Sequence, residues 1–171
     1  SHIPYQANRM LGVISVMFNH AELLGWRPDG SNPCRHVKKY KELKRERYLT
    51  AEEMQKLGNA LTQSERDGIE SIYAIAAYRL LMLTGCRLGE IQLLKWEYVR
   101  GDYLHLPDSK TGAKKVLLAP PAVTVLQSIP RIDGNPYVIA AEKTNKWLND
   151  LQHPWQRIRE LAGLSDLRIH D

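Results

Sequence analysis

The chain has 171 residues and a mass of 19.6 kDa, which is enough for one full domain, or for one domain with a fragment of another. Apolar residues make up 43% and charged residues 25%, so a sizeable core is possible and the composition argues against wholesale disorder. The net charge of +5 favours an anionic partner without proving one. No apolar run approaches the ~18 residues that a membrane span needs. With only Cys34 and Cys86, a disulfide scaffold and a four-cysteine zinc site are excluded, and a reducing cytoplasm is the expected compartment.

The first predicted element is the tail of an amphipathic helix, over residues 8–24. Its apolar residues recur at helical spacing and the helix ends at Gly25. One such helix cannot bury its own apolar face. We therefore expect it to pack on the next domain, or to be the remnant of a helical domain further upstream. The stripe consists of Leu11, Ile14, Met17 and Phe18.

A basic stretch follows over residues 35–47, with seven basic residues, two acidic ones and a net charge of +5. One interpretation is a solvated linker. The other is a strap along a phosphate backbone, because the stretch lies between two predicted folded units and can wrap around a polyanion. The candidate DNA-binding residues are Arg35, Lys38, Lys39, Lys41, Lys44, Arg45 and Arg47.

Three helices are predicted next. Thr50 and Glu53 form a capping box at the start of the first. Ser64 with Asp67 predicts a second start, so we expect a helix over about 66–83, and its apolar residues on nearly all sides indicate a central core helix. Thr84 and Gly85 end it. A third helix is expected to start near Arg87 and to carry Leu88, Ile91, Leu94 and Trp96.

The pattern then changes to short strands over 98–106 and 114–118, joined by a turn over 107–113. Two prolines open another helix at 120–121. A last helical region is expected over 144–162, kinked or split at Pro154 and stopped at Gly163. The predicted fold class is α+β and mainly helical, with helices packed against a small antiparallel sheet.

The segment T-G-C-R-L-G-E-I over residues 84–91 is a candidate chemical site. Arg87 and Glu90 are three residues apart and lie on one helical face. They form either an ordinary intrahelical ion pair or an arginine aimed by its carboxylate at a phosphate, near a helix N-terminus.

Two further residues could carry chemistry. Lys110 lies in the turn between the strands, where it is either exposed decoration or a proton donor to a leaving oxygen. His170, close to the end of the chain, is either structural or catalytic. Cys34 and His36 make a weak metal signal because no second ligand pair is suitably spaced. The sequence lacks the glycine-rich nucleotide loops, the H-E-x-x-H zinc motif and the G-x-S-x-G nucleophile motif.

The order of these pieces resembles the tyrosine recombinase (phage integrase) family. The resemblance rests on T-G-C-R-L-G-E-I, then K-T-G in a hairpin turn, then A-G-L…L-R-I-H-D, and it covers nearly the whole chain. It implies that residues 1–30 are the last helix of a core-binding domain. Residues 31–47 would be the interdomain linker, and residues 48–171 an incomplete catalytic domain.

The resemblance also implies a function and roles for single residues. The family cuts and rejoins DNA at specific sites through a 3′-phosphotyrosine link, without metal or nucleotide, and acts as a tetramer on two duplexes. Arg87 resembles the arginine that binds the scissile phosphate, and Glu90 the acidic residue that supports it. Lys110 resembles the lysine that protonates the leaving 5′-hydroxyl, and His170 the histidine that assists proton transfer. The partner would be double-stranded DNA, and the host a mobile element or prophage.

This chain departs from the family pattern at its end. The H-x-x-R motif needs an arginine two positions past Asp171, and the nucleophilic tyrosine lies further on. None of the eight tyrosines present matches that place. We therefore expect these residues to bind DNA without cleaving it, as a monomer. The alternatives are a regulator that kept the fold and lost catalysis, and a protein-interaction domain whose basic stretch only aids solubility.

Overall fold

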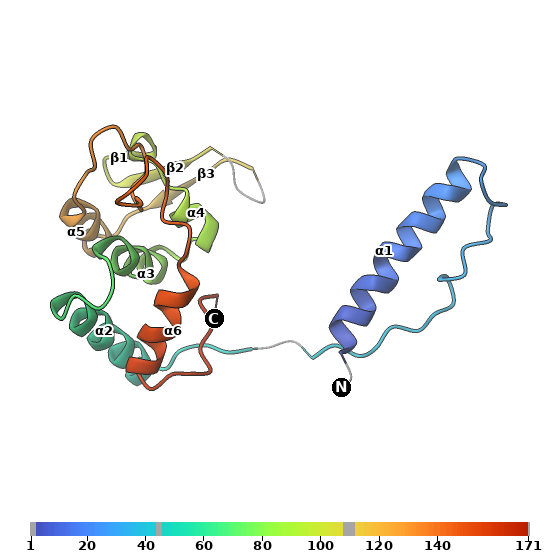
Figure 1. Cartoon of the computed structure of the whole chain (residues 1–171), viewed down its shortest axis with the longest axis horizontal. Coiled ribbons are helices and arrows are strands. Elements are labelled where there is room, and N and C mark those ends of the chain that lie inside the picture. Colours follow the sequence, from blue (N-terminus) through green and yellow to red (C-terminus); the bar gives the residue numbers. More distant parts are fainter. Residues whose placement is uncertain (1–2, 44–45, 108–111, 171) are drawn as a thin grey trace. The chain divides into compact units, whose positions relative to one another are not determined.

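The computed structural model describes residues 3–43, 46–107 and 112–170. The chain divides into two compact units, Ser1–Glu46 and Arg47–Asp171, and both are drawn in Figure 1. The assignment of these units to a core-binding remnant, a linker and a catalytic domain stays a prediction.

The first unit is one long helix, α1 (Pro4–Leu23), with a return segment beside it. The predicted helix is confirmed: residues 8–23 are the later part of α1, which begins at Pro4, where proline is tolerated in the first turn. The return segment is held by side-chain amides: Asn8 donates to the carbonyl of Tyr40 at 2.9 Å, and Asn32 donates to the carbonyl of Ser15 at 3.0 Å. The predicted apolar stripe is largely uncovered within this unit, where Asn8 is the buried residue of α1.

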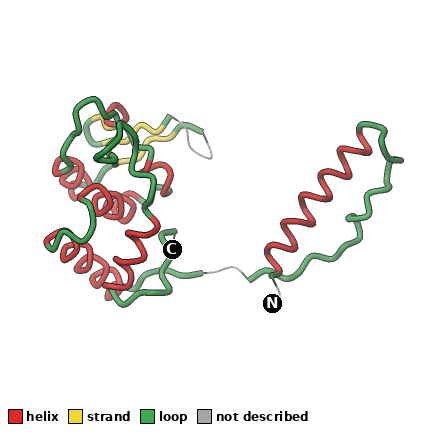
Figure 2. The backbone as a smooth tube through the Cα atoms, viewed as in Figure 1, coloured by secondary structure: helices red, strands yellow, loops and turns green. Residues whose placement is uncertain are grey.

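The second unit holds the remaining elements (Figures 1 and 2). Its helices surround α3, which packs against α2, α4 and α5, while α6 packs against α2. A three-stranded antiparallel sheet in the order β1-β2-β3 lies beyond α4. The elements are α2 (Ala51–Arg66), α3 (Ile72–Thr84), α4 (Leu88–Gln92), the 3-10 helix η1 (Trp96–Tyr98), β1 (Val99–Arg100), β2 (Tyr103–Leu106), β3 (Lys114–Leu117), α5 (Pro120–Ser128) and α6 (Gln152–Leu161).

The start of α2 follows the predicted capping box. The Thr50 hydroxyl accepts from the backbone N–H of Glu53 at 3.2 Å, and the Glu53 carboxylate accepts from the N–H of Thr50 at 2.9 Å. The predicted helix start at Ser64 and Asp67 is wrong. Ser64 is buried inside α2, which continues to Arg66, and Ser71 caps the next helix by accepting from the N–H of Ala74.

The prediction of a central core helix is confirmed, although its bounds differ from those expected. α3 buries seven of its thirteen residues and has the covered, all-round apolar surface that the sequence predicts. The helix predicted after it is much shorter than expected. α4 ends at Gln92, so Leu94 and Trp96 lie beyond it, and Trp96 belongs to η1.

The single strand predicted over 98–106 is wrong: Tyr98 belongs to η1, and the rest forms two antiparallel strands, β1 and β2, because the chain reverses at Gly101, whose φ of 55° suits a tight turn. Leu106 of β2 pairs with Lys114 of β3, so the strands on either side of residues 107–113 pair as predicted, while residues 108–111 lie outside the described residues.

The later helices follow the sequence with one further correction. α5 begins at the predicted prolines. The last helix was predicted over 144–162, but α6 begins at Gln152, and Pro154 lies in its first turn, where a missing N–H costs nothing. Within the described residues, no helix is both long enough and apolar enough to cross a membrane. The predicted α+β, mainly helical class is confirmed.

Candidate active site

Arg87 lies at the junction between α3 and α4. α3 ends at Gly85, whose φ of 62° places it in the left-handed region that glycine adopts without strain. Buried Cys86 follows, and Arg87 then has extended backbone just before α4 begins. The turn at Gly85 therefore brings Arg87 out of the core, and its side chain is 51% exposed.

Glu90 fixes Arg87 from the first turn of α4. Its carboxylate accepts from the backbone N–H of Arg87 at 2.8 Å and from the Arg87 guanidinium at 3.1 Å. The Glu90 side chain is only 7% exposed. The predicted ion pair is thus present, and it joins a buried carboxylate to a half-exposed cation. α4 has five residues, so its dipole adds less positive potential than the long helix expected from the sequence.

Lys114 is a second cation on the same carboxylate. Its ammonium nitrogen lies 2.8 Å from Oε2 of Glu90, and its side chain is 32% exposed. Burial raises the pKa of the Glu90 carboxyl, but hydrogen bonds from Lys114 and from Arg87 outweigh it, so the net pKa lies below its ordinary value. Glu90 is therefore held as a carboxylate between two positive groups.

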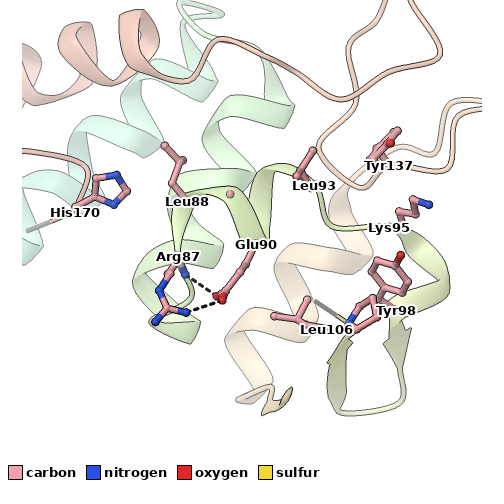
Figure 3. Close-up of a pocket in the computed structure, with 11 residues that line it drawn as sticks. Arg87, Leu88, Glu90, Leu93, Lys95, Tyr98, Leu106, Tyr137 and His170 are labelled. Atoms are coloured by element: carbon pink, nitrogen blue, oxygen red, sulfur yellow. Dashed lines mark hydrogen bonds and ion pairs between the residues drawn. The ribbon is translucent and has the colours of Figure 1, made fainter. Parts of the chain in front are cut away.

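Arg87 and Glu90 line a pocket of about 880 Å³ (Figure 3). Arg87, Leu88 and Glu90 come from the start of α4, and His170 comes from the last described segment of the chain. Figure 3 shows His170 on its own loop, on the side of Arg87 away from Tyr98. The structure therefore brings three of the predicted site residues, Arg87, Glu90 and His170, to one cavity.

The segment that carries His170 is attached to α6. The carbonyl of Leu167 accepts from the indole N–H of Trp155 at 3.3 Å and from the guanidinium of Arg159 at 3.0 Å. Leu167 is itself buried in the core. These contacts bring a residue more than 80 positions from Arg87 to the same pocket, which sequence spacing alone does not predict.

The other end of the pocket holds a lysine between two aromatic rings. The Lys95 ammonium lies 5.8 Å from the ring centre of Tyr98 and 5.9 Å from that of Tyr137. Both tyrosines line the pocket with Lys95. Sequence patterns did not point to these three residues, because Tyr137 lies about 40 positions from the other two and a short-range pattern cannot connect them.

Lys114 was not predicted as a site residue either, although its place on the strand was a signal. Side chains alternate between the two faces of a strand, so Lys114 shares a face with Val116, which packs against the core. A lysine on the inward side of a short strand needs an anionic partner. The predicted lysine of the turn, Lys110, lies outside the described residues.

The candidate DNA-binding residues of the basic stretch have different surroundings. Lys38, Lys39 and Lys41 are exposed, and Arg35 pairs with Glu22 at 3.0 Å. Lys44 and Arg45 lie outside the described residues.

Arg47 is bound within the second unit. Its guanidinium lies 2.7 Å from Glu53 and 3.0 Å from Asp166. These bonds raise the pKa of Arg47 and lower that of Glu53 to about 2. Arg47 thus joins the start of α2 to the segment that leads to His170, and its predicted role in DNA binding stays a prediction.

Known proteins similar in sequence to this chain are DNA recombinases and integrases. A shufflon-specific DNA recombinase of Escherichia coli is 28% identical over 166 residues, which cover 94% of this chain and 40% of that protein. Prophage integrase IntE of Escherichia coli is 30% identical over 111 residues, covering 65% of this chain and 28% of that protein. The chain thus spans less than half the length of these relatives. No protein-family model matches the sequence.

The fold is similar to that of solved recombinases. A lambda integrase dimer bound to a COC′ core site matches with a TM-score of 0.72 and 22% identity, over 98% of this chain and 63% of that chain. A lambda integrase tetramer bound to a Holliday junction matches with a TM-score of 0.70 and 24% identity, over 91% of this chain and 46% of that chain. At these identities the likeness shows the fold. The resemblance predicted from the motifs is thus confirmed at the level of similarity: the chain is similar in sequence to a shufflon-specific DNA recombinase and to prophage and phage integrases, and it has the fold of lambda integrase.

Proposed function

We propose that this chain is the DNA-phosphate-binding part of a site-specific recombinase that cuts and rejoins strands through a 3′-phosphotyrosine intermediate. The observation that carries the proposal is the Arg87–Glu90 pair. A buried carboxylate holds a half-exposed guanidinium at a pocket that His170 also lines. A guanidinium has several N–H donors in a fixed plane, which suits phosphate oxygens.

The chemistry of phosphoryl transfer fits such a site. Negative charge collects on the phosphoryl oxygens in the transition state, and cations held in place beforehand stabilise it. Removing one such donor typically lowers the rate by roughly 10²–10³. In this proposal Arg87 binds the scissile phosphate and Glu90 orients Arg87. Lys110 protonates the leaving 5′-hydroxyl and His170 assists proton transfer, as the family resemblance implies.

We propose one function for the 171 residues and a wider one for the whole protein. For the 171 residues alone we propose binding of double-stranded DNA as a monomer. For the whole protein we propose strand cleavage and action as a tetramer on two duplexes. We also propose that it comes from a mobile element or prophage and acts in the cytoplasm. The domain division proposed is 1–30, 31–47 and 48–171, with the basic linker wrapping the DNA.

The first test is binding to a fluorescently labelled duplex oligonucleotide between about 50 and 200 mM salt. We expect affinity to fall steeply, because each neutralised phosphate adds about 0.9 to the log–log salt slope. The triple variant K38Q/K39Q/K41Q removes three exposed linker lysines and should reduce the slope. The matched control K56Q/K143Q/K146Q removes three exposed lysines from the second unit and should change it less.

Two outcomes would favour the alternatives. Negligible duplex binding at about 50 mM salt would contradict the proposal and favour a protein-interaction domain. Duplex binding by the whole protein without any covalent tyrosine–DNA adduct on a cleavable substrate would favour a regulator that kept only the fold.

A further inference from the structure

Lys114 belongs to no motif of the sequence analysis, yet it makes the shortest recorded side-chain contact to Glu90. Its ammonium nitrogen lies 2.8 Å from Oε2, compared with 3.1 Å from the Arg87 guanidinium to Oε1. Oε2 also accepts the backbone N–H of Arg87. One carboxylate therefore connects the start of α4 with the start of β3.

We propose that Lys114 is a positioning residue for Arg87, acting through Glu90. This inference rests on the proposed function, in which Arg87 binds a DNA phosphate. Lys114 would not touch the phosphate itself. Its role is to hold the Glu90 carboxylate charged and in place, so that Arg87 is presented in one orientation.

Burial explains why a second cation is needed. The Glu90 side chain is 7% exposed, and a buried carboxylate is costly unless charge and hydrogen bonds compensate it. Arg87 alone compensates it poorly, because a phosphate competes for the same guanidinium. Lys114 remains on Oε2 when Arg87 turns to a ligand. Glu90 therefore stays ionised while Arg87 binds.

Because Lys114 and Arg87 bind different oxygens of Glu90, the Arg87 guanidinium keeps N–H donors for a ligand. Among the described residues, the recorded bond from the Arg87 guanidinium to Glu90 uses Nη1 alone. A guanidinium has five N–H donors. If Lys114 were absent, Oε2 would lose a charged partner and the guanidinium would be drawn to both oxygens in a bidentate pair. Lys114 thus favours the geometry in which Arg87 still has N–H groups to donate.

The same contact joins two parts of the proposed site. Lys114 pairs with Leu106 across the base of the β2–β3 hairpin, and Leu106 lines the pocket. In the sequence, Lys110 lies four positions before Lys114. The charged groups recorded at Glu90 are Arg87 from the chain before α4 and Lys114 from β3. Lys114 therefore ties the strand that follows the turn to the residue that supports Arg87.

The first arm of the test needs no DNA. The backbone N–H of Arg87 donates to Glu90, so its nuclear magnetic resonance shift reports the ionisation of that carboxylate. We expect the K114M variant to move the Glu90 titration midpoint to higher pH, and K114R to restore it. K115M is the matched control, because Lys115 is an exposed neighbour on the same strand with the same charge. K114Q replaces K114M if the latter unfolds.

The second arm is a double-mutant cycle on binding to a labelled duplex oligonucleotide. We expect K114M to weaken binding by about three- to fivefold, the range of a partly exposed charge pair. In an R87A background the same change should have no further effect, because Lys114 acts through Arg87. An independent phosphate contact would instead give equal losses in both backgrounds.

The outcomes separate this inference from the proposed function. An unchanged Glu90 midpoint in K114M, or equal losses in both backgrounds, would overturn the role of Lys114 while leaving DNA binding intact. If the unmodified chain binds no duplex, the proposed function fails, and with it the positioning role. The first arm then decides only whether the Lys114–Glu90 contact exists.

Discussion

α1 and α3 are both rich in apolar residues, but they differ in what covers them. α3 buries seven residues among α2, α4 and α5, including Ile75 and Tyr78. α1 leaves large side chains exposed within its own unit, and Ile14 is 40% exposed. Apolar spacing therefore predicts that a helix forms, whereas burial depends on which elements fold around it. Stability of this chain should accordingly be concentrated in the unit that contains α3.

The largest expected loss of stability comes from replacing a buried isoleucine of α3, compared with an exposed isoleucine of α1. Ile75→Ala should lower the free energy of unfolding by about 2–5 kcal/mol, because Ile75 is fully buried and the change leaves a cavity. Ile14→Ala should change it by less than about 0.5 kcal/mol. Urea denaturation followed by circular dichroism measures both. Equal losses for the two variants would contradict the comparison.

A smaller effect is expected from two tyrosine hydroxyls. Tyr78 donates to the carbonyl of Leu151 at 2.8 Å inside the core, and burial raises its pKa. Tyr78→Phe should cost about 1–2 kcal/mol, because the Leu151 carbonyl is left without that donor. The exposed Tyr5 donates to Leu43 in the first unit, and Tyr5→Phe should cost less than about 0.5 kcal/mol. Similar losses in the same denaturation experiment would show that burial does not set the difference.

The smallest effect concerns pH and the Arg47–Glu53 pair at the boundary of the second unit. The pKa of Glu53 is lowered from 4.5 to about 2 by its bonds to Arg47 and to the backbone of Thr50. Its stabilising contribution is therefore present above about pH 4.5, and is lost as the pH falls toward 2. The urea midpoint measured over this window should depend less on pH in E53Q. The exposed neighbour variant E52Q serves as control, and an E53Q profile that matches it would contradict this role.

Local patterns predicted the elements where the signal was complete within a few residues. The capping box of Thr50 and Glu53, the prolines before α5 and the pairing of the two strands around the turn are all of this kind. The boundaries failed where two signals competed. Ser64 was predicted to begin a helix but is buried within α2, and residues 144–151 were predicted to be helical but lie before α6.

The site was predicted where it lies in one motif and missed where it depends on the fold. Arg87 and Glu90 are neighbours in sequence, so their pairing was predicted, but its geometry differs: Arg87 precedes α4 with extended backbone, and Glu90 pairs with it from the third position of the helix rather than along one helical face. Lys114 reaches Glu90 because the hairpin returns to α4, and Tyr137 reaches Lys95 from a distant loop. Such contacts depend on tertiary packing, which no spacing rule supplies.

The binding of a DNA phosphate by Arg87 is tested most directly by measuring duplex binding and thermal stability together for R87A. Arg87 is half-exposed and lies in the pocket, so the account predicts clearly weaker duplex binding and a smaller salt slope, with the melting temperature nearly unchanged. The control R66A removes an exposed arginine at the end of α2 and should leave binding nearly unchanged. A collapse of the melting temperature in R87A, or binding equal to that of R66A, would contradict the claim that Arg87 binds a DNA phosphate.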